Sequence, residues 1–293
     1  MHDIPYFDAH CDTLSRCIAQ GWDLYENPGH LDLKRLSAYA PVGQVFAIFL
    51  DSEKVPAEDR WGCVKEQADL FWRLRREHPE VMGHCALSLE GAELIGCDEG
   101  RLEELRAWGV KWVNLTWNHP NALSGSCVTG EGLTDTGRAF AKRCWELGMG
   151  VDVSHLSDRG FWDLMEILDG PILASHSNSR ALCPNRRNLT DDMARALIGA
   201  GGYIGINFFT EFLGKNAAAE TAADHLEHFL SLGGENCVGL GSDFDGADVP
   251  PDLRGVEDVP NLWASLERRG YGRELLRQIF YGNLARFIEN PEK

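Results

Sequence analysis

Five short segments of the chain carry side chains of the types that bind divalent metal ions. They are FDAHCDT with His10 and Asp12, SLEGAE with Glu90, VDVSH with His155, ASHSNS with His176, and GSDFDG with Asp243. Imidazole and carboxylate groups without cysteine suit a catalytic zinc ion or a similar divalent cation. The sequence therefore predicts a metal site assembled from widely separated parts of the chain.

The spacing of these residues indicates two ions rather than one. His10 and Asp12 are two positions apart, so on a β-strand both side chains point to the same side and can reach one ion. His155 and His176, together with Glu90, would hold a second ion, and one carboxylate can bridge two ions about 3.5–4 Å apart. Such a pair of ions activates water and polarises a carbonyl group, which is the chemistry of a hydrolase. We expect two divalent ions per chain, with zinc as the metal.

Each of these residues also has a simpler structural interpretation. A histidine at the end of a strand is often a hydrogen-bonded structural residue, and an aspartate after a buried strand often caps the next helix. Chance placement explains the joint pattern less well, because three of the ten histidines fall at strand ends beside acidic residues. We therefore favour metal binding for the set as a whole.

Eight short, mostly apolar runs are predicted as the strands that position these residues. Near-continuous apolar runs are typical of parallel strands that are buried on both faces. The runs cover residues 6–10, 44–50, 84–89, 111–116, 150–154, 172–175, 203–208 and 238–242. Helical patterns lie between or after them, at residues 57–78, 103–108, 134–147, 157–168, 190–200, 222–232 and 271–288.

The alternation of strands and helices predicts an α/β fold, a (β/α)8 TIM barrel of the metallo-dependent hydrolase type, formed by residues 1–293 as one domain. An open doubly wound sheet is the alternative, but it would usually show a glycine-rich turn after the first strand, where this chain has CDTLSRC. Pro250, Pro251 and Pro260 are interpreted as one loop after the eighth strand. In a barrel, the C-terminal ends of the strands meet at one rim, where all five segments would come together.

Composition excludes several classes of function. The chain has 293 residues and a formal net charge of −17, which disfavours nucleic acid and anionic membranes as partners. We expect no membrane span and no secretory signal, because no apolar run reaches about 18 residues and the first residues are not basic. The nine cysteines include no C-x-x-C pair, so reduced thiols and a cytoplasmic location are expected.

The motifs FDAHCDT, SLEGAE, VDVSH, SHS followed by CPNRRN, and GSDFDG resemble the membrane (renal) dipeptidase family of zinc peptidases, over nearly the whole chain. The resemblance implies a (β/α)8 barrel related to the amidohydrolases and a small dipeptide as substrate. It also implies tolerance of a D-residue on the C-terminal side of the dipeptide, and the possibility of a homodimer.

The resemblance also implies a role for each matching residue. Asp243 would accept and donate the proton of the water molecule between the metal ions. Arg187 would pair with the carboxylate of the substrate, a task that suits the fork of a guanidinium group. The implied metal ligands are His10 and Asp12 for one zinc ion, His155 and His176 for the other, and Glu90 as the bridge.

One position departs from the family pattern. Mammalian members carry a histidine directly after the Leu-Thr of the fourth strand, where it is thought to support the tetrahedral intermediate. In this chain the position is Trp117, followed by Asn118 and His119. Either His119 takes over a catalytic role or that role is lost. Trp117 and Asn118 are expected to contact the substrate at the same rim.

Two other functions remain as alternatives. A different amidohydrolase, such as a deaminase or a lactonase, would usually begin with H-x-H and often uses a lysine of the fourth strand as a modified bridge. Here the motif is H-x-D, and Lys111 lies at the start of the predicted strand. A non-catalytic barrel that serves only for binding would be expected to have lost metal ligands, yet all five are present. The dipeptidase is therefore the preferred hypothesis.

Overall fold

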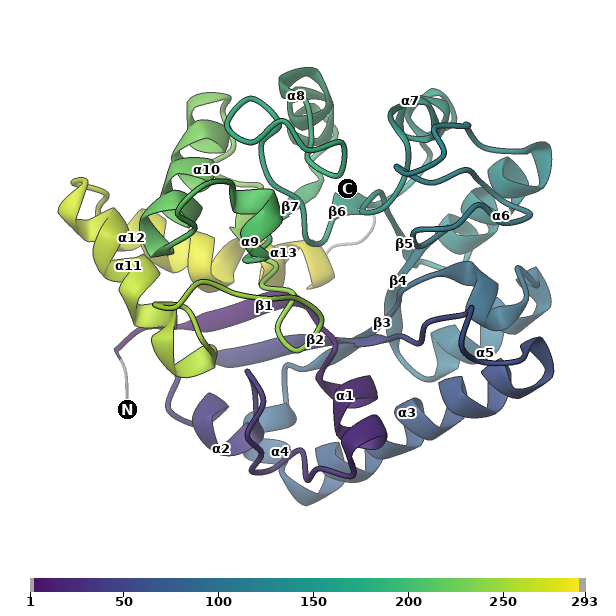
Figure 1. The fold of residues 1–293 in the computed structure, drawn as a ribbon, viewed down its shortest axis with the longest axis horizontal. Helices are drawn as coiled ribbons and strands as arrows, with labels where there is room; N and C mark the ends of the chain where they lie inside the picture. Colours follow the sequence, from purple (N-terminus) through teal and green to yellow (C-terminus); the bar gives the residue numbers. More distant parts are fainter. Residues whose placement is uncertain (1–2, 290–293) are drawn as a thin grey trace.

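Eight parallel strands close into a barrel in the order in which they occur along the chain. The structure is a computed structural model and describes residues 3–289. Figure 1 shows the helices arranged around the strands. The strands are β1 (Tyr6–Cys11), β2 (Val42–Ile48), β3 (Ala86–Leu89), β4 (Val110–Asn114), β5 (Gly150–Asp152), β6 (Ile172–Ala174), β7 (Tyr203–Ile206) and β8 (Val238–Leu240). The predicted (β/α)8 barrel is confirmed, and the open-sheet alternative is wrong.

Several strands end earlier than the apolar runs that predict them. β5, β6 and β8 each end before the last residues of the predicted strand. At those ends, side-chain carboxylates replace neighbouring strands as hydrogen-bond acceptors. The backbone N–H groups of Ser154 and Ser175 donate to Asp152 Oδ1, at 2.9 and 3.0 Å, and that of Ser242 donates to Asp8 Oδ2 at 3.0 Å. The rim is therefore built from irregular backbone that buried carboxylates hold in place.

Most of the helices follow the predicted pattern. The side chains of Thr134, Ser157 and Thr190 accept hydrogen bonds from backbone N–H groups at the starts of α6 (Asp135–Glu146), α7 (Asp158–Glu166) and α8 (Asp191–Gly199). No helix within residues 3–289 combines the length and the apolar character that crossing a bilayer requires. The helices that match are α3 (Ala57–Glu77), α5 (Leu102–Ala107), α6 (Asp135–Glu146), α7 (Asp158–Glu166), α8 (Asp191–Gly199) and α10 (Ala219–Ser231).

The region after β8 differs from the prediction. Pro260 does not belong to a loop but lies in the first turn of α11 (Val259–Arg268), where the missing N–H of proline has no intrahelical partner to lose. The predicted helix 271–288 consists of α12 (Arg273–Arg277), a π-helical segment (Gln278–Gly282) and α13 (Asn283–Glu289). The short helices α1 (Thr13–Gln20), α2 (Leu33–Leu36), α4 (Pro79–Met82) and α9 (Thr210–Leu213) were not predicted.

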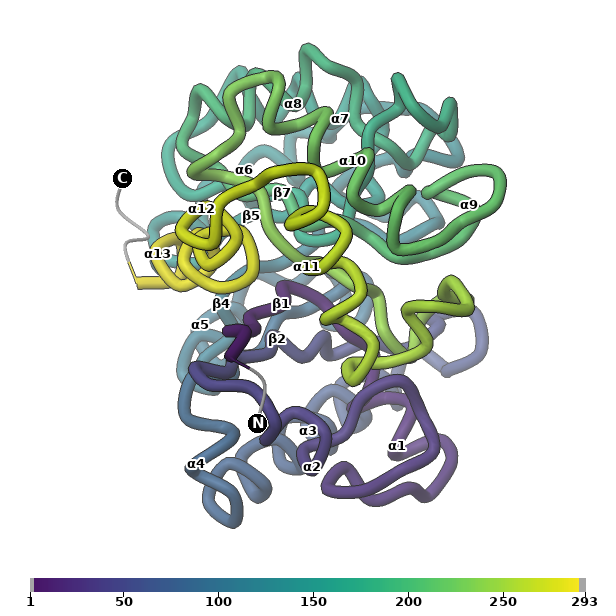
Figure 2. The backbone as a smooth tube through the Cα atoms, turned by 90° about the vertical axis from the view of Figure 1, so that its left-hand side faces the viewer, coloured from purple at the N-terminus to yellow at the C-terminus, as the bar shows by residue number. Residues whose placement is uncertain are grey.

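The interior of the barrel is apolar near the starts of the strands. Phe7, Val45, Ala86, Trp112, Leu173 and Tyr203 belong to one buried apolar group. They come from six strands, and strands on opposite sides of a closed barrel can meet only through its interior. α13 packs against β1, β7 and β8 and adds Leu284 to the group. Figure 2 shows this last helix beside the N-terminal strand. The opposite end of the barrel is left for polar side chains.

Trp61, Trp72 and Trp162, three tryptophans on the outer helices, pack in different ways. Trp61 stacks on Trp108, with ring centroids 5.2 Å apart, and Trp72 Nε1 donates to the carbonyl oxygen of Trp108 at 2.9 Å. Both therefore pack on neighbouring parts of the same chain. Trp162 is 43% exposed.

Candidate metal centre and active site

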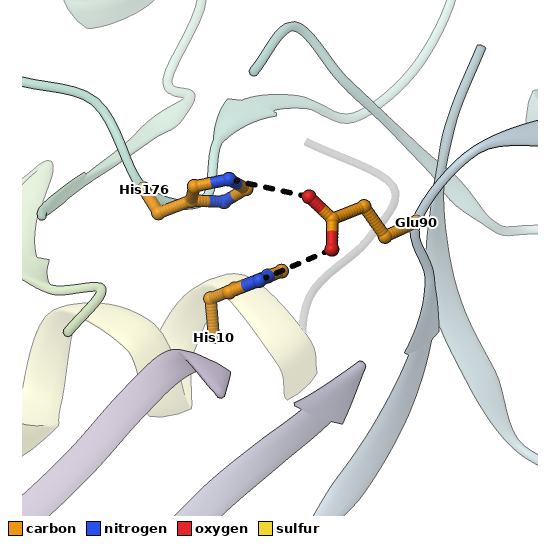
Figure 3. A group of neighbouring side chains, drawn as sticks. All are labelled: His10, Glu90 and His176. Atoms are coloured by element: carbon orange, nitrogen blue, oxygen red, sulfur yellow. Dashed lines mark ion pairs between the residues drawn. The ribbon is translucent and has the colours of Figure 1, made fainter. Parts of the chain in front are cut away.

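The predicted metal ligands come together at the C-terminal ends of four strands. His10 lies within β1, and Asp12 directly follows that strand. Glu90 directly follows β3, and the other two ligands follow β5 and β6 within a few residues. All five side chains are buried. Figure 3 shows the imidazoles of His10 and His176 pointing toward the carboxylate of Glu90, each toward a different oxygen.

Glu90 stands between two sets of ligand atoms. Its Oε2 atom lies 3.5 Å from His10 Nε2. Its Oε1 atom lies 2.9 Å from His155 Nε2 and 3.6 Å from His176 Nε2. Each carboxylate oxygen therefore faces one half of the site, an arrangement that suits a carboxylate bridging two ions.

The half of the site around His10 also includes two aspartates. His10 Nε2 lies 3.6 Å from Asp12 Oδ2 and 3.9 Å from Asp243 Oδ1. The last glycine of GSDFDG, Gly246, leaves space for these carboxylates. A Cβ atom on it would lie 2.0 Å from Asp12 Oδ2 and 2.6 Å from Asp243 Oδ1. A side chain at this position would therefore collide with both carboxylates.

The unpaired atoms of the site fit a metal ion. Both ring nitrogens of His10 and the Oδ1 atom of Asp12 are buried without a hydrogen-bond partner. Leaving buried polar groups unpaired is costly, and buried charges are normally paired or coordinate metal ions. Two groups of residues bring possible ligand atoms within 4.8 Å of one another: His10, Glu90 and His176, and His10, Asp12 and Asp243. The donor set is one of nitrogen and oxygen, which suits a catalytic zinc ion.

Burial and neighbouring charges shift the pKa values of the ligands. Burial and the charge of Glu90 raise the pKa of Asp12 to about 7. Burial opposes ionisation of Glu90, but the charge of His10 and the contact with His155 Nε2, 2.9 Å away, hold its pKa below the usual range. Burial and the charge of Arg187 lower the pKa of His155 to about 4. At neutral pH that ring is uncharged, which is the form of imidazole that binds metal.

Two residues of the site have backbone conformations that are unusual for residues other than glycine. φ is +73° at His155 and +63° at Asp243. Such conformations cost about 1–3 kcal/mol each and persist where the surroundings hold them in place. The carbonyl oxygen of His155 accepts the backbone N–H of Cys127 at 2.8 Å, and the backbone N–H of Asp243 donates to the carbonyl oxygen of His10 at 3.2 Å.

The two aspartates of DFDG have different surroundings. Asp243 Oδ2 accepts from Asn207 Nδ2 at 2.9 Å, and its other oxygen faces His10. Burial raises the pKa of Asp243. Asp245 instead accepts the backbone N–H of His30 at 2.7 Å and the hydroxyl group of Thr13 at 2.6 Å. Asp245 therefore connects loops, whereas Asp243 reaches the predicted metal ligands.

Arg187 is a buried guanidinium group with unpaired nitrogens. Its Nη1 atom donates to Ser177 Oγ at 2.8 Å, while Nε and Nη2 are buried without a partner. The guanidinium carbon lies 5.6 Å from the centre of the Phe212 ring, and burial lowers the pKa of the group. Within residues 3–289, no carboxylate forms an ion pair with Arg187. Two of its donors can therefore receive an anionic group from a ligand.

Residues 117–119, where the sequence departs from the family pattern, lie in two different environments. Asn118 Oδ1 lies 2.9 Å from His155 Nδ1, and the Trp117 ring lies 6.2 Å from the ring of His155. His119 points elsewhere: its Nε2 atom lies 3.4 Å from Glu53 Oε2, and its side chain is 43% exposed. The structure therefore brings Asn118 to a predicted metal ligand but pairs His119 with a residue of the loop after β2.

A cavity of about 950 Å³ opens above these residues. Its lining includes Asp12, Glu90, Trp117, Asn118, His119, His155, Arg187 and Asp243. Sequence reasoning missed an apolar part of its wall, to which Ile18, Phe49, Leu50, Val55, Phe209 and Phe212 contribute. Phe49 and Leu50 are the last residues of a predicted strand. Because the C-terminal ends of the strands form the rim, these two residues could have been predicted to line the cavity. Nothing in the sequence patterns marked the others.

A parallel barrel with histidine and carboxylate side chains at its C-terminal rim is typical of metal-dependent hydrolases. The sequence matches the membrane dipeptidase family (peptidase family M19) over residues 1–293, and the chain belongs to this family. It is 37% identical to an uncharacterized dipeptidase of Schizosaccharomyces pombe over 222 residues, 71% of this chain and 53% of the relative. An uncharacterized protein of Acinetobacter calcoaceticus is 32% identical over 287 residues, 78% of this chain and 89% of the relative.

Two solved structures are similar over nearly their whole length. The first is a metallopeptidase from Rhodobacter sphaeroides bound to a phosphinate mimic of L-Ala-D-Ala. It has 30% identity and a TM-score of 0.87, with 98% of this chain and 99% of the other covered. The second is a dipeptidase of family M19, with 31% identity, a TM-score of 0.88 and 99% of each chain covered. The protein is therefore a hydrolase of the metallo-dipeptidase type, and the alternatives of a deaminase, a lactonase and a non-catalytic barrel are set aside.

Proposed function

We propose that this protein is a binuclear zinc dipeptidase that hydrolyses small dipeptides, including those with a D-residue at the C-terminus. The main support is the position of Glu90, whose two oxygens face different sets of ligands. Zinc is chosen because the ligands are imidazoles and carboxylates. Acceptance of L-D dipeptides rests on family resemblance and on the Rhodobacter relative, which binds a mimic of L-Ala-D-Ala.

Three residues of the chain would have separate roles in hydrolysis. Arg187 would bind the C-terminal carboxylate of the dipeptide through its unpaired Nε and Nη2 atoms and so orient the peptide bond in the cavity. Asp243 would accept a proton from the attacking water and donate it to the nitrogen of the leaving amine. When bound, the metal ions would supply Lewis acidity for both water and carbonyl. Asn207, which donates to Asp243 Oδ2, would keep that carboxylate oriented.

The proposal is tested by measuring metal content and turnover on the same sample. The substrates would be L-Ala-L-Ala, L-Ala-D-Ala, D-Ala-L-Ala and the C-terminal amide of L-Ala-D-Ala. We expect two zinc ions per chain, hydrolysis of the first two dipeptides, and little hydrolysis of the amide. Full activity with one tightly held ion would exclude a binuclear site, and failure to hydrolyse any dipeptide would exclude the function.

Glu90 provides a second test of the binuclear site. Glu90→Gln should lose both ions, because one oxygen serves each half of the site. His10→Ala removes a ligand from one half only and should retain about one ion per chain. Equal metal loss in the two variants would contradict the bridging role of Glu90.

A further inference from the structure

An imidazole binds a metal ion only through a ring nitrogen that carries no proton. Which nitrogen is free depends on the hydrogen bond that the other nitrogen makes. In His155 and His176 the Nε2 atoms face Glu90 Oε1, where an ion would be bound, and binding an ion through Nε2 requires the proton of each neutral ring to be on Nδ1. The groups around the two Nδ1 atoms therefore decide whether these rings are ready to bind metal.

At His155 the partner of Nδ1 is the side-chain oxygen of Asn118, at 2.9 Å. An amide oxygen only accepts hydrogen bonds, so it favours the ring form with the proton on Nδ1. The backbone near Asn118 is held in place, because its carbonyl oxygen accepts the hydroxyl group of Ser126 at 2.8 Å. Asn118 is thus fixed on the side of the ring that faces away from Glu90.

At His176 the partner is a serine that a buried carboxylate orients. Ser175 Oγ lies 2.6 Å from His176 Nδ1 and donates its proton to Asp152 Oδ2. The other oxygen of Asp152 accepts the backbone N–H groups of Ser154 and Ser175. Because the hydroxyl proton points to Asp152, the lone pairs of Ser175 Oγ are left to accept the proton of His176 Nδ1.

These contacts are absent from the third histidine of the site. His10 Nδ1 is buried and has no hydrogen-bond partner within the described residues. The hydrogen-bond partners of Nδ1 therefore occur only in the half of the metal centre that contains His155 and His176.

We propose that Asn118, and Ser175 together with Asp152, are positioning residues that fix the metal-binding ring form of His155 and His176. The role of Asn118 thereby changes from the expected contact with substrate to support of a metal ligand. The inference rests on the proposed metal centre. Removal of such supporting partners typically costs 10–100-fold in metal affinity or activity.

The test compares variants that remove each acceptor with variants that keep it. Asn118→Leu and Ser175→Ala remove the partners of Nδ1, whereas Asn118→Asp and Ser175→Thr retain an oxygen. Ser179→Ala is a matched control, because Ser179 is a buried serine near the same loop whose hydroxyl group has no partner. The affinity of each metal-free protein for Zn²⁺ would be measured by competition with a chromophoric chelator, without any peptide substrate. NMR of ¹⁵N-labelled histidine would report the ring form in the zinc-loaded proteins.

We expect Asn118→Leu and Ser175→Ala to lower the affinity for one zinc ion per chain by about 10–100-fold. In each of these variants one histidine should lose its Nδ1–H signal. Asn118→Asp and Ser175→Thr should restore most of the affinity, and Ser179→Ala should not change it.

Unchanged zinc affinity in both removal variants would overturn the proposal, as would an equal loss in Ser179→Ala. If Asn118→Leu instead raised KM without changing zinc affinity, Asn118 would be a substrate contact. Because the chelator assay needs no hydrolysis, its result does not depend on whether the protein hydrolyses dipeptides.

Discussion

At the scale of single residues, the unpaired donors of Arg187 give the clearest expectation about substrate binding. A hydrogen bond to a charged group contributes about 1.5–3 kcal/mol. Arg187→Met should therefore raise KM for a dipeptide by about ten-fold or more. Steady-state kinetics with a dipeptide and its C-terminal amide would measure the effect.

Arg186 provides the control for this experiment, because it is the neighbouring arginine and is exposed. Its Nη1 atom donates to the carbonyl oxygen of Val128 at 3.1 Å, which is a contact between loops. Arg186→Met should change KM much less than Arg187→Met. A similar rise in KM for both variants would mean that binding of the carboxylate was assigned to the wrong arginine.

The contrast between Asp243 and Asp245 separates proton transfer from loop structure. Asp243→Asn removes the proposed proton acceptor and should lower kcat by about 10²–10⁴-fold with nearly unchanged zinc content. Burial raises the pKa of Asp243 in the protein alone, whereas two neighbouring cations would lower it, so the ions would do most of the water activation. Asp245→Asn should act mainly on stability, because Asp245 accepts from His30 and Thr13. A larger loss of kcat in Asp245→Asn would reverse the two assignments.

His119 is expected to contribute little to catalysis. The sequence left open whether it replaces the missing histidine of the fourth strand. The structure pairs its exposed ring with Glu53, so the loss of that role is favoured. A well-placed donor to an oxyanion contributes about 2.7–4 kcal/mol, and its removal lowers kcat by 10²–10³-fold. His119→Ala should instead leave kcat within a few-fold of the wild type. A hundred-fold drop with unchanged zinc content would show that His119 does act on the intermediate.

At the scale of elements, the sequence predicted the order of the strands because apolar runs reflect burial on both faces. It predicted the ligand positions because His10 ends such a run, because Glu90, His155 and His176 directly follow one, and because Asp12 lies two residues after His10. It did not predict α11, since Pro260 was interpreted as part of a loop although proline is tolerated in the first turn of a helix. It could not predict the contact between Asn118 and His155, which depends on how two loops fold onto each other. Contacts between loops leave no periodic pattern in the sequence.

The second glutamate of SLEGAE illustrates such a contact. Glu93 is largely buried, and its two oxygens accept from the backbone N–H of Trp117 at 3.3 Å and from Asn121 Nδ2 at 2.9 Å. It therefore holds the loop that carries Asn118. Glu93→Leu would leave the Trp117 N–H without this acceptor and Asn121 Nδ2 with only the carbonyl oxygen of Leu115, and each lost acceptor should cost about 1–3 kcal/mol or less. We expect a clear loss of stability in urea unfolding and a smaller loss in Glu93→Gln, which keeps one acceptor. The exposed Glu99 is the control: Glu99→Gln should have little effect, and an equal loss there would contradict the role of Glu93.

At the scale of the whole molecule, the centre depends on closure of the barrel. His10 and Asp243 lie near opposite ends of the chain, and the pairing of β1 with β8 brings their segments together. The carboxylate of Asp8 strengthens the pairing of β1 with β8 by accepting the backbone N–H of Ser242. The sequence could predict that the ligands meet, because the C-terminal ends of parallel strands in a barrel share one rim. It could not predict which carboxylate oxygen faces which ring, because that depends on side-chain conformations.

Removal of metal should therefore lower the stability of the entire barrel. The centre gathers buried carboxylates and unpaired ring nitrogens, and a ligand that binds only the folded state stabilises it by about 2.7 kcal/mol when its concentration is 100-fold above Kd. For domains of 150–250 residues, 1 kcal/mol corresponds to about 2–4 °C in Tm. Treatment with a chelator should then lower Tm by about 5–10 °C for each ion removed. Calorimetry would measure the fall in Tm that the chelator causes in each protein. This fall should be largest in the wild type and about half as large in His10→Ala. It should be smallest in Glu90→Gln, because Glu90 serves both halves of the metal centre. A chelator-induced shift of Glu90→Gln equal to that of the wild type would show that the stabilising ions bind elsewhere.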